Sequence, residues 1–343
     1  MSRFARVSRI AFVGIFLTIL VAPGAVMLVT PDEELVIVGE AKQPRPRPSG
    51  LRQMGPHLLA YHTWFNRSFG LRQAMLSINA KLNFALLHRS TSDKVAVGRN
   101  AWLFYTDDTE LACSRHLRPF SDEQILYYRD LVRSHARWMR EQGIHFIMIV
   151  GPDKHTIYPE LLPLSMRSVG PTSRFEQLAA ELARSAPEVD FIDMRPVLLA
   201  DKATHQVYYR DDTHWNERGV FLAYREIVRH LEARFGPLGA RTEEDFAWDQ
   251  QMQVVGDLAR MAGLTSQQET VPKLTPKRPW AATLRDKRGA PPRPGGPPPE
   301  ASTDCSGAPL DRALLLHDSF GERFAWPLAE LFGHMELSRH NFL

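Results

Sequence analysis

The chain has 343 residues, of which 44% are hydrophobic and 24% are charged, a balance typical of a folded protein with one large core or two smaller ones. This composition excludes a chain that is disordered over most of its length. The formal net charge is only +3, and no stripe of Lys and Arg interleaved with aromatic residues runs along the sequence, which argues against binding to nucleic acid.

The first predicted element is an uncharged apolar run from Ile10 to Thr30. It has about the length that a helix needs to cross the hydrocarbon core of a bilayer. Three arginines precede it and acidic residues follow it, so the positive-inside rule places the bulk of the chain outside the cytoplasm. We predict an uncleaved membrane anchor over residues 1–31. A cleaved signal sequence is the alternative, because the Ala22 to Ala25 region resembles a processing site, and a buried core helix is the third reading.

A spacer is predicted over residues 32–65, since Gln43 to Arg52 is rich in Pro and Arg and favours a semi-rigid, extended chain. Its basic residues also suit contact with anionic lipid. A helix is then predicted from Leu71 to about His88, where apolar residues recur near the helical period at Leu71, Met75, Ile78, Leu82 and Leu86. Apolar residues on both sides of Gly98 to Asn100 predict a hairpin or a bulge.

The central segment alternates strands with helices, the pattern of a parallel sheet covered by helices. Serine followed three residues later by Gln or Glu predicts the starts of two helices, Ser121 to Gln142 and Ser173 to Arg184. The short apolar runs His145 to Val150 and Val189 to Met194 predict buried strands. An amphipathic helix is predicted from Glu217 to Phe235, where Gly-Pro ends it.

Residues 265–309 differ from the rest, because Pro- and Gly-rich stretches such as Pro291 to Pro299 lack backbone donors and do not pack a core. We predict an exposed insertion over this range. Order is expected to resume with a strand at Ala313 to Leu316, followed by a turn and an amphipathic helix to about Phe332. A further short strand is predicted at Met335 to Ser338.

Ser319 lies in the turn between that strand and that helix, within the run His317-Asp318-Ser319-Phe320-Gly321. A serine placed there in an open α/β sheet presents its hydroxyl at the carboxyl edge of the sheet, near free N–H groups at the start of the helix. Those N–H groups can stabilise an oxyanion. The alternative is that Ser319 only caps the helix, which is a common use of serine.

A second unusual run, Tyr208 to Asn216, lies between a predicted strand and the helix that begins at Glu217. It contains Asp212 and His214, which are close enough along the chain to share a hydrogen bond. Asp212 would then orient the imidazole and leave its other nitrogen free to accept a proton from Ser319. The alternative is a structural loop histidine that is bonded to backbone.

Several segments also match a known family in their order and spacing. They are Gly98 to Phe104, Pro152 to Lys154, Ile157 to Pro163, Asp212 to Trp215, Gly256 to Ala259 and Asp318 to Phe320. In these segments, which extend over most of the chain from about Asn66 to Phe332, the sequence resembles the SGNH-hydrolase-like domain of the alginate-type polysaccharide O-acetyltransferases, the AlgJ and AlgX group.

The resemblance implies an α/β fold, an SGNH-hydrolase-like three-layer sandwich with a mostly parallel sheet, over residues 66–343. It implies Ser319 as the nucleophile, His214 as general base and acid, and Asp212 as the partner of His214. Asp211 is the alternative partner, because Asp211 and His214 have the D-x-x-H spacing that is common elsewhere in the superfamily.

The sequence departs from the family at His317, where glycine often stands and lets the backbone turn tightly. His317, Asp318 and His214 together permit a metal site, but no further ligands follow at fixed spacing, so no metal and no cofactor is expected. Cys113 and Cys305 fit an oxidising compartment and can form a pair.

Lys154, Tyr158 and Trp215 are predicted to bind substrate. Lys154 and Tyr158 follow a predicted strand end, where loops build binding sites in α/β sheets, and Trp215 can stack on a sugar face together with Trp102. Ordinary surface or core packing is the alternative for all of them.

Together with the apolar N-terminal run, the resemblance implies a serine O-acetyltransferase, attached to the bacterial inner membrane by one helix, whose catalytic domain lies in the periplasm. It would transfer acetyl groups through an acetyl-serine intermediate to hydroxyls of an alginate-like exopolysaccharide. Cytoplasmic acetyl-CoA cannot reach such a domain, so the resemblance implies a membrane-bound O-acyltransferase as the partner that supplies acetyl groups. A polysaccharide acetyl esterase of the same fold and a non-catalytic polysaccharide-binding or assembly protein are the alternatives.

Overall fold

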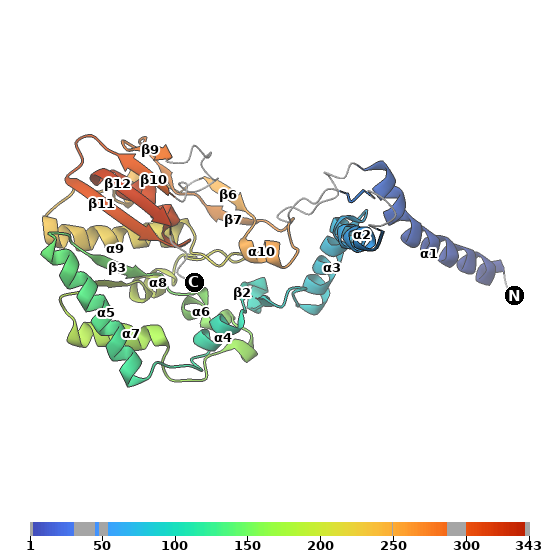
Figure 1. Ribbon diagram of the computed structural model, residues 1–343, viewed down its shortest axis with the longest axis horizontal. Helices are drawn as coiled ribbons and strands as arrows, with labels where there is room; N and C mark the ends of the chain where they lie inside the picture. The colour runs from blue at the N-terminus through green and yellow to red at the C-terminus, as the bar shows by residue number, and fades with distance from the viewer. Residues whose placement is uncertain (1–2, 31–44, 48–53, 249, 287–299, 340–343) are drawn as a thin grey trace. The chain divides into compact units, whose positions relative to one another are not determined.

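The computed structural model describes residues 3–30, 45–47, 54–248, 250–286 and 300–339 (Figure 1). The chain divides into two compact units, Met1–Leu87 and His88–Leu343. The predicted catalytic domain, beginning at residue 66, would start inside a helix of the first unit. The boundary predicted from the sequence, between residues 65 and 66, therefore differs from the boundary between the two compact units, at residues 87 and 88.

The first unit consists of three helices: α1 (Arg3–Val29), α2 (Met54–Ser68) and α3 (Arg72–Leu87). In α1, Val7–Met27 has a mean hydropathy of 2.4 and none of it is buried. Its length and composition meet the requirement for a membrane-spanning helix, which a signal sequence meets equally. Helix α3 confirms the predicted helix, whereas α2 occupies part of the range predicted as an extended spacer, and most of the Pro- and Arg-rich run lies outside the described residues.

A hairpin opens the second unit. Strand β1 (Val95–Val97) pairs antiparallel with β2 (Leu103–Tyr105), and the turn between them contains η2 (Arg99–Ala101). Asn100 and Ala101 adopt positive φ there, 53° and 61°. The predicted hairpin is confirmed.

The three main predicted helices of this unit are confirmed to within a residue or two at each end. They are α5 (Asp122–Glu141), α7 (Arg174–Ser185) and α9 (Glu217–Phe235). Capping boxes at Ser121 and Ser173 begin the first two, because each serine accepts from the backbone N–H three residues on and the side chain of that residue bonds back. Gly236, at φ +83°, ends α9.

The strands form a mixed arrangement. Strand β3 (Ile147–Val150) runs parallel to β4 (Asp190–Asp193), as the sequence predicts. A four-stranded sheet has the order β11-β12-β10-β9, in which only β11 and β12 are parallel. Its strands are β9 (Thr283–Asp286), β10 (Glu300–Asp304), β11 (Leu310–His317) and β12 (Phe332–Arg339). The parallel pair β11–β12 therefore continues into antiparallel strands, whereas β3 and β4 form a two-stranded sheet of their own.

Residues 265–309 differ from the predicted exposed insertion. They supply β9 and β10 to the four-stranded sheet. They also contain β7 (Glu269–Pro272), which pairs with β6 (Gln251–Val254), and β8 (Thr275–Pro276), which pairs with β5 (Phe246–Ala247). The Pro- and Gly-rich composition is concentrated in residues 287–299, which lie outside the described residues. The flanking segments contain residues that suit strands, so the composition of the whole window hid them.

The connection from β11 to β12 positions the candidate serine. It consists of a turn at 318–320, then η6 (Gly321–Phe324) and α11 (Ala325–Ala329). Strand β12 confirms the short strand that the sequence predicts, but the intervening helix is shorter than expected. The remaining elements are α4 (Asp108–Ser114), α6 (Lys154–Ile157), η3 (Pro159–Leu161), η4 (Leu164–Met166), α8 (Arg195–Asp201), η5 (Glu243–Asp245) and α10 (Asp257–Met261).

The main core of the second unit joins α9, the β1–β2 hairpin and the sheet around β12 through buried aromatic and aliphatic side chains such as Tyr208, Trp215 and Met335. A smaller cluster beneath α5 and α7, which lie side by side in Figure 1, contains Ala136 and Leu182. Cys113 and Cys305 are both free thiols, so the pairing that the sequence permits is not formed.

Candidate functional site

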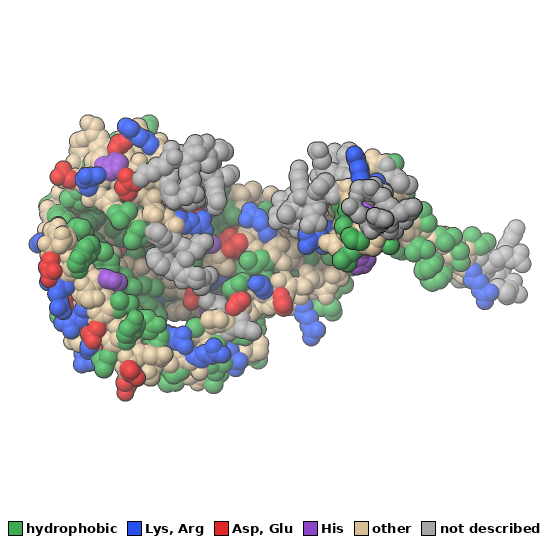
Figure 2. Space-filling model, in the orientation of Figure 1, with side chains coloured by type: hydrophobic (Ala, Val, Ile, Leu, Met, Phe, Trp, Pro, Cys, Tyr) green, Lys and Arg blue, Asp and Glu red, His purple; other side chains and the backbone are tan. Residues whose placement is uncertain are grey.

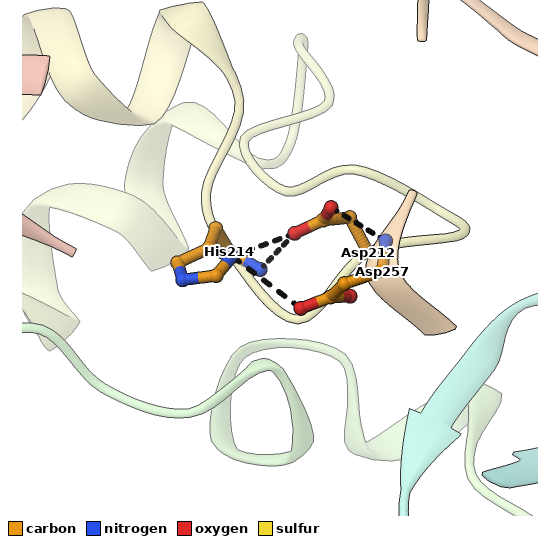
Figure 3. Close-up of side chains that lie close together, drawn as sticks. All are labelled: Asp212, His214 and Asp257. Atoms are coloured by element: carbon orange, nitrogen blue, oxygen red, sulfur yellow. Dashed lines mark hydrogen bonds and ion pairs between the residues drawn. The ribbon is translucent and has the colours of Figure 1, made fainter. Parts of the chain in front are cut away.

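Asp212 and His214 form a hydrogen-bonded pair on the loop that precedes α9 (Figure 3). The Nδ1–H of His214 donates to Oδ1 of Asp212 over 2.7 Å, and the backbone N–H of His214 donates to the same oxygen over 3.0 Å. Nε2 of His214 is buried, and no described residue gives it a hydrogen-bond partner. The pair thus holds the ring in one orientation and leaves the opposite nitrogen available for proton transfer.

The structure distinguishes the two candidate partners of the histidine. Asp211 is fully buried and its carboxylate accepts from the Arg210 guanidinium over 3.0 and 3.1 Å and from Nε2 of Gln267 over 2.9 Å. It therefore serves a separate ion pair. Asp212 is the carboxylate that contacts His214.

Asp257, at the start of α10, is a second carboxylate beside the histidine that the sequence analysis missed. Its Oδ1 accepts from the backbone N–H of Thr213 over 2.8 Å, and its Oδ2 accepts from the Thr213 hydroxyl over 2.5 Å. The same Oδ2 lies 3.7 Å from Nδ1 of His214. Its backbone N–H in turn donates to Oδ2 of Asp212 over 2.8 Å. The two carboxylates and the histidine form one network.

Gly256 explains how α10 comes so close to this loop. A Cβ at this position would lie 1.9 Å from the carbonyl oxygen of Asp211 and 2.7 Å from the backbone nitrogen of Asp212. Only glycine allows that approach. The Gly-Asp pair at 256–257 was the available signal in the sequence, but no periodicity connects it with a histidine more than forty residues earlier.

Ser319 lies in the turn that follows β11. Oδ1 of Asp318 accepts from the backbone N–H groups of Phe320 and Gly321 over 2.8 and 3.3 Å, so the aspartate caps the turn. The segment that follows is the short 3₁₀-helix η6. The prediction of free N–H groups at a long helix start is therefore wrong for these two residues, because Asp318 already uses them.

The serine turn and the histidine loop meet through Phe320. Nε1–H of Trp215 donates to the carbonyl oxygen of Phe320 over 3.1 Å, and the Phe320 ring lies 4.9 Å from the His214 ring. Gly151, directly after β3, packs against both aromatic side chains. The residue next to Ser319 thus contacts the histidine, although Ser319 does not hydrogen-bond to Nε2 of His214 in this structure.

Lys154, which the sequence predicts to bind substrate, is buried. It is 3% exposed, and its Nζ donates to the carbonyl oxygens of Tyr209, Arg210 and Asp212 over 3.1, 3.0 and 2.6 Å. Burial lowers the pKa of Lys154 to about 7, against the opposing effect of the carboxylates around it. All three N–H groups of the ammonium donate to backbone carbonyl groups of the histidine loop, so Lys154 supports that loop, and its role in substrate binding stays a prediction.

Tyr158 and Trp215 are also packing residues. The Tyr158 hydroxyl accepts from the backbone N–H of Val207 over 3.0 Å, and its ring lies 4.3 Å from that of Trp102. Trp215 is 1% exposed and links the two loops, as described above. Both side chains are buried in this structure, and their predicted role in substrate binding stays a prediction.

Opposing effects set the charge state of the pair. Burial lowers the pKa of His214, but the hydrogen bond and charge of Asp212, with the charge of Asp257, outweigh burial and raise it overall. Burial raises the pKa of Asp212, yet the hydrogen bond from His214 and its charge lower it overall. The imidazole is therefore a stronger base than an ordinary histidine.

Within the described ranges, Asp212, His214 and Asp257 also form the one cluster whose ligand atoms lie close enough, within 4.8 Å, to hold a metal ion. The same carboxylate oxygens already accept hydrogen bonds from Thr213, His214 and backbone N–H groups. His317 is not part of this cluster, since its Nδ1–H donates to the carbonyl oxygen of Asp318. The arrangement suits an acid–base group, in which Asp212 and Asp257 both act on Nδ1.

Comparison with known proteins matches residues 95–289 to the family described as "SGNH hydrolase-like domain, acetyltransferase AlgX". This range includes Asp212, His214 and Asp257 and ends before Ser319. Two similar relatives are the probable alginate O-acetylases AlgJ of Pseudomonas aeruginosa and Pseudomonas fluorescens. The first is 26% identical over 161 residues, which cover 47% of this chain and 39% of the relative. The second is 23% identical over 236 residues, which cover 65% of this chain and 52% of the relative. The chain spans about half the length of the curated relatives it matches.

Solved structures that resemble this chain include the O-acetyltransferase domain of Pseudomonas putida AlgJ, with 19% identity, a TM-score of 0.46 and coverage of 72% of this chain and 80% of that one. Bacillus cereus PatB1 with a sulfonyl adduct has 16% identity, a TM-score of 0.48 and coverage of 69% and 84%. The predicted α/β, SGNH-hydrolase-like fold class is confirmed by the family match. Because that match covers 195 of 343 residues, the chain belongs to the family of AlgX-type SGNH-hydrolase-like domains.

Proposed function

We propose that this protein is an O-acetyltransferase that moves acetyl groups through an acetyl-Ser319 intermediate to hydroxyls of an alginate-like bacterial exopolysaccharide. Family membership and relatives named as probable alginate O-acetylases support the proposal. The observation that carries it is the buried, unpartnered Nε2 of His214, which is oriented by Asp212 and lies beside the turn that holds Ser319.

In the first step, Oγ of Ser319 attacks the carbonyl carbon of the acetyl donor while its proton passes to Nε2 of His214. The tetrahedral species then collapses, and the leaving group departs with that proton. The serine turn must shift enough to bring Oγ to Nε2, which is a common change between free and substrate-bound enzymes. Acetyl-Ser319 and a neutral imidazole remain.

In the second step, a polysaccharide hydroxyl loses its proton to Nε2 as its oxygen attacks the acetyl carbon. The Ser319 oxygen leaves and recovers the proton from Nε2, so the enzyme returns to its starting state. Asp212 stabilises the imidazolium that forms in both steps, through its 2.7 Å hydrogen bond to Nδ1.

The apolar helix α1 supports an attachment to the inner membrane by one span, with the catalytic unit in the periplasm. Cytoplasmic acetyl-CoA would not reach the site directly. The proposal therefore includes a membrane-bound O-acyltransferase that delivers acetyl groups, as the sequence resemblance implies.

Incubation of the purified protein with an activated acetate ester tests the central step. We expect the peptide that contains Ser319 to gain the mass of one acetyl group. Addition of acceptor polysaccharide should then remove the adduct and place acetate on the polymer. Release of free acetate with no gain on the polymer would indicate the esterase, and a folded protein that forms no adduct would indicate a non-catalytic binding protein.

Asp257→Asn is expected to shift the pH dependence of acetyl-enzyme formation. The negative charge of Asp257 helps to raise the pKa of His214, so its removal lowers that pKa. His214 acts as a base only when neutral, and the acidic limb of the rate profile should therefore move to lower pH. The measurement is the rate of acetyl-Ser319 formation between pH 5 and 9 (about the range in which histidine titrates).

Asp130→Asn is the matched control, because Asp130 is an exposed carboxylate on α5 and its loss should leave the profile unchanged. An unshifted acidic limb in the Asp257 variant, with the protein folded, would show that Asp257 only holds Thr213 in place, through its backbone N–H and hydroxyl. A large fall in the maximal rate without a shift would lead to the same conclusion.

A further inference from the structure

Helix α3 presents an apolar stripe to its surroundings. Met75, Ile78 and Leu82 are 46%, 58% and 53% exposed. They share one face with Leu86 at 3.6 residues per turn, whereas the buried Ala80 and half-buried Phe84 lie on the opposite face. Leu71, at φ +67°, precedes the helix and is not part of this face. The predicted stripe is thus real, but the helix packs by its other side.

Helix α2 repeats this pattern. Leu58 and Phe65, two turns apart on one face, are 61% and 41% exposed. The buried Trp64 lies on a different face and is covered by the Arg45 guanidinium, 5.2 Å from its ring. Both helices therefore expose large apolar side chains on a face that does not pack against the other described residues of the first unit.

The charge of this part of the sequence is entirely of one sign. Residues 41–92 contain eight Lys and Arg and no Asp or Glu, and the other residues contain the remaining 34 basic and all 39 acidic residues. Arg72 and Lys81 lie on either side of the apolar stripe of α3 by helical geometry. Exposed apolar residues flanked by long basic side chains are typical of helices that lie in the surface of an anionic bilayer.

The turn between α2 and α3 lies against one end of the apolar helix α1. A Cβ on Gly70 would be 2.2 Å from the carbonyl oxygen of Pro23 and 2.8 Å from the backbone nitrogen of Met27. Met27 is the last residue of the apolar span Val7–Met27. The turn is therefore held at the end of the apolar span. Because a span of this length crosses the hydrocarbon core, its end lies at the membrane surface. Hydrophobic side chains also cover α1 itself (Figure 2).

We propose that α2 and α3 form a membrane-surface platform, which lies on the anionic bilayer crossed by α1 and inserts the apolar stripe of α3 among the lipid chains. The platform adds a second attachment to the single span. It fixes the level at which the chain leaves the membrane.

The full-length protein in liposomes tests this proposal. A polarity-sensitive fluorophore is attached to Ile78→Cys or Leu82→Cys in a Cys113→Ser background, and brominated lipids serve as quenchers. We expect a blue-shifted emission and roughly a two-fold loss of intensity on quenching, as for a helix at the boundary of the acyl chains, and a larger effect with phosphatidylglycerol than with phosphatidylcholine alone. Gln73→Cys, on the opposite face of α3, should remain in a polar environment.

Leu17→Cys in α1 provides the positive control for insertion. Quenching at Leu17 without quenching at Ile78 or Leu82 would overturn the platform. Burial of the label only in native membrane vesicles, and not in pure lipid, would show that a protein covers the stripe and would also overturn it. Acetyl-enzyme formation measured in the same preparations reports separately on the catalytic unit.

Discussion

Ser319→Ala is expected to lower the rate of acetyl transfer to polysaccharide by about 10⁴-fold or more, because no other group replaces the attacked oxygen of a covalent intermediate. The acetyl adduct on the peptide containing residue 319 should be absent. The measurement combines initial rates with an acetylated donor and mass analysis of the protein trapped before acceptor is added.

His214→Ala should cause a loss of similar size, and the double variant should be little worse than either single one, because nucleophile and base act as a unit. Ser134→Ala, an exposed serine on α5, should retain full activity. Full activity in the Ser319 variant would contradict the proposed acetyl-serine intermediate. If the two substitutions instead lowered the rate additively in free energy, Ser319 and His214 would not act as a unit.

Local features of the fold were predictable because their causes lie within a few residues. The capping boxes at Ser121 and Ser173 each use a serine and the third residue after it, and the helices begin where these pairs predict. The parallel pairing of β3 and β4 follows from short apolar runs separated by a helix. The pairing of Asp212 with His214 needed only a spacing of two residues.

Contacts between distant segments were not predictable in the same way. Lys154 was expected in a binding loop, but its position is set by three carbonyl groups more than fifty residues later. Asp257 reaches the histidine only because Gly256 lets two backbone segments touch. Trp215 and Tyr158 are buried by packing against segments that no sequence period connects with them. The sequence around the loop thus predicted residues that bind substrate, whereas in the structure these residues hold backbone segments in place.

Lys154→Met is expected to destabilise the second unit by about 3 kcal/mol, because it removes the Nζ donor from three backbone carbonyl groups while nearly preserving side-chain volume. The carbonyl oxygen of Arg210 keeps the backbone N–H of Leu103 as a donor, so the loss falls mainly on Tyr209 and Asp212. Relief of the cost of burying an ammonium offsets part of that loss. The loop that carries Asp212 and His214 should exchange its amide hydrogens faster. Chemical denaturation and hydrogen exchange of the peptide around residues 206–220 measure the two effects. Lys94→Met, an exposed lysine, should change neither.

The effect of Lys154→Met should also depend on pH in a defined direction. The pKa of Lys154 is lowered by burial from its ordinary value of 10.5 to about 7 in the folded protein, so between these pH values the unfolded chain holds the proton more firmly than the folded one. Wild-type stability therefore gains a contribution that rises with pH across this window, and the methionine variant lacks it. The difference in unfolding free energy between the two proteins should grow by about 2 kcal/mol from pH 7 to pH 9. A difference that is constant with pH would mean that Lys154 titrates alike in both states, and that the ammonium is not buried beneath the histidine loop.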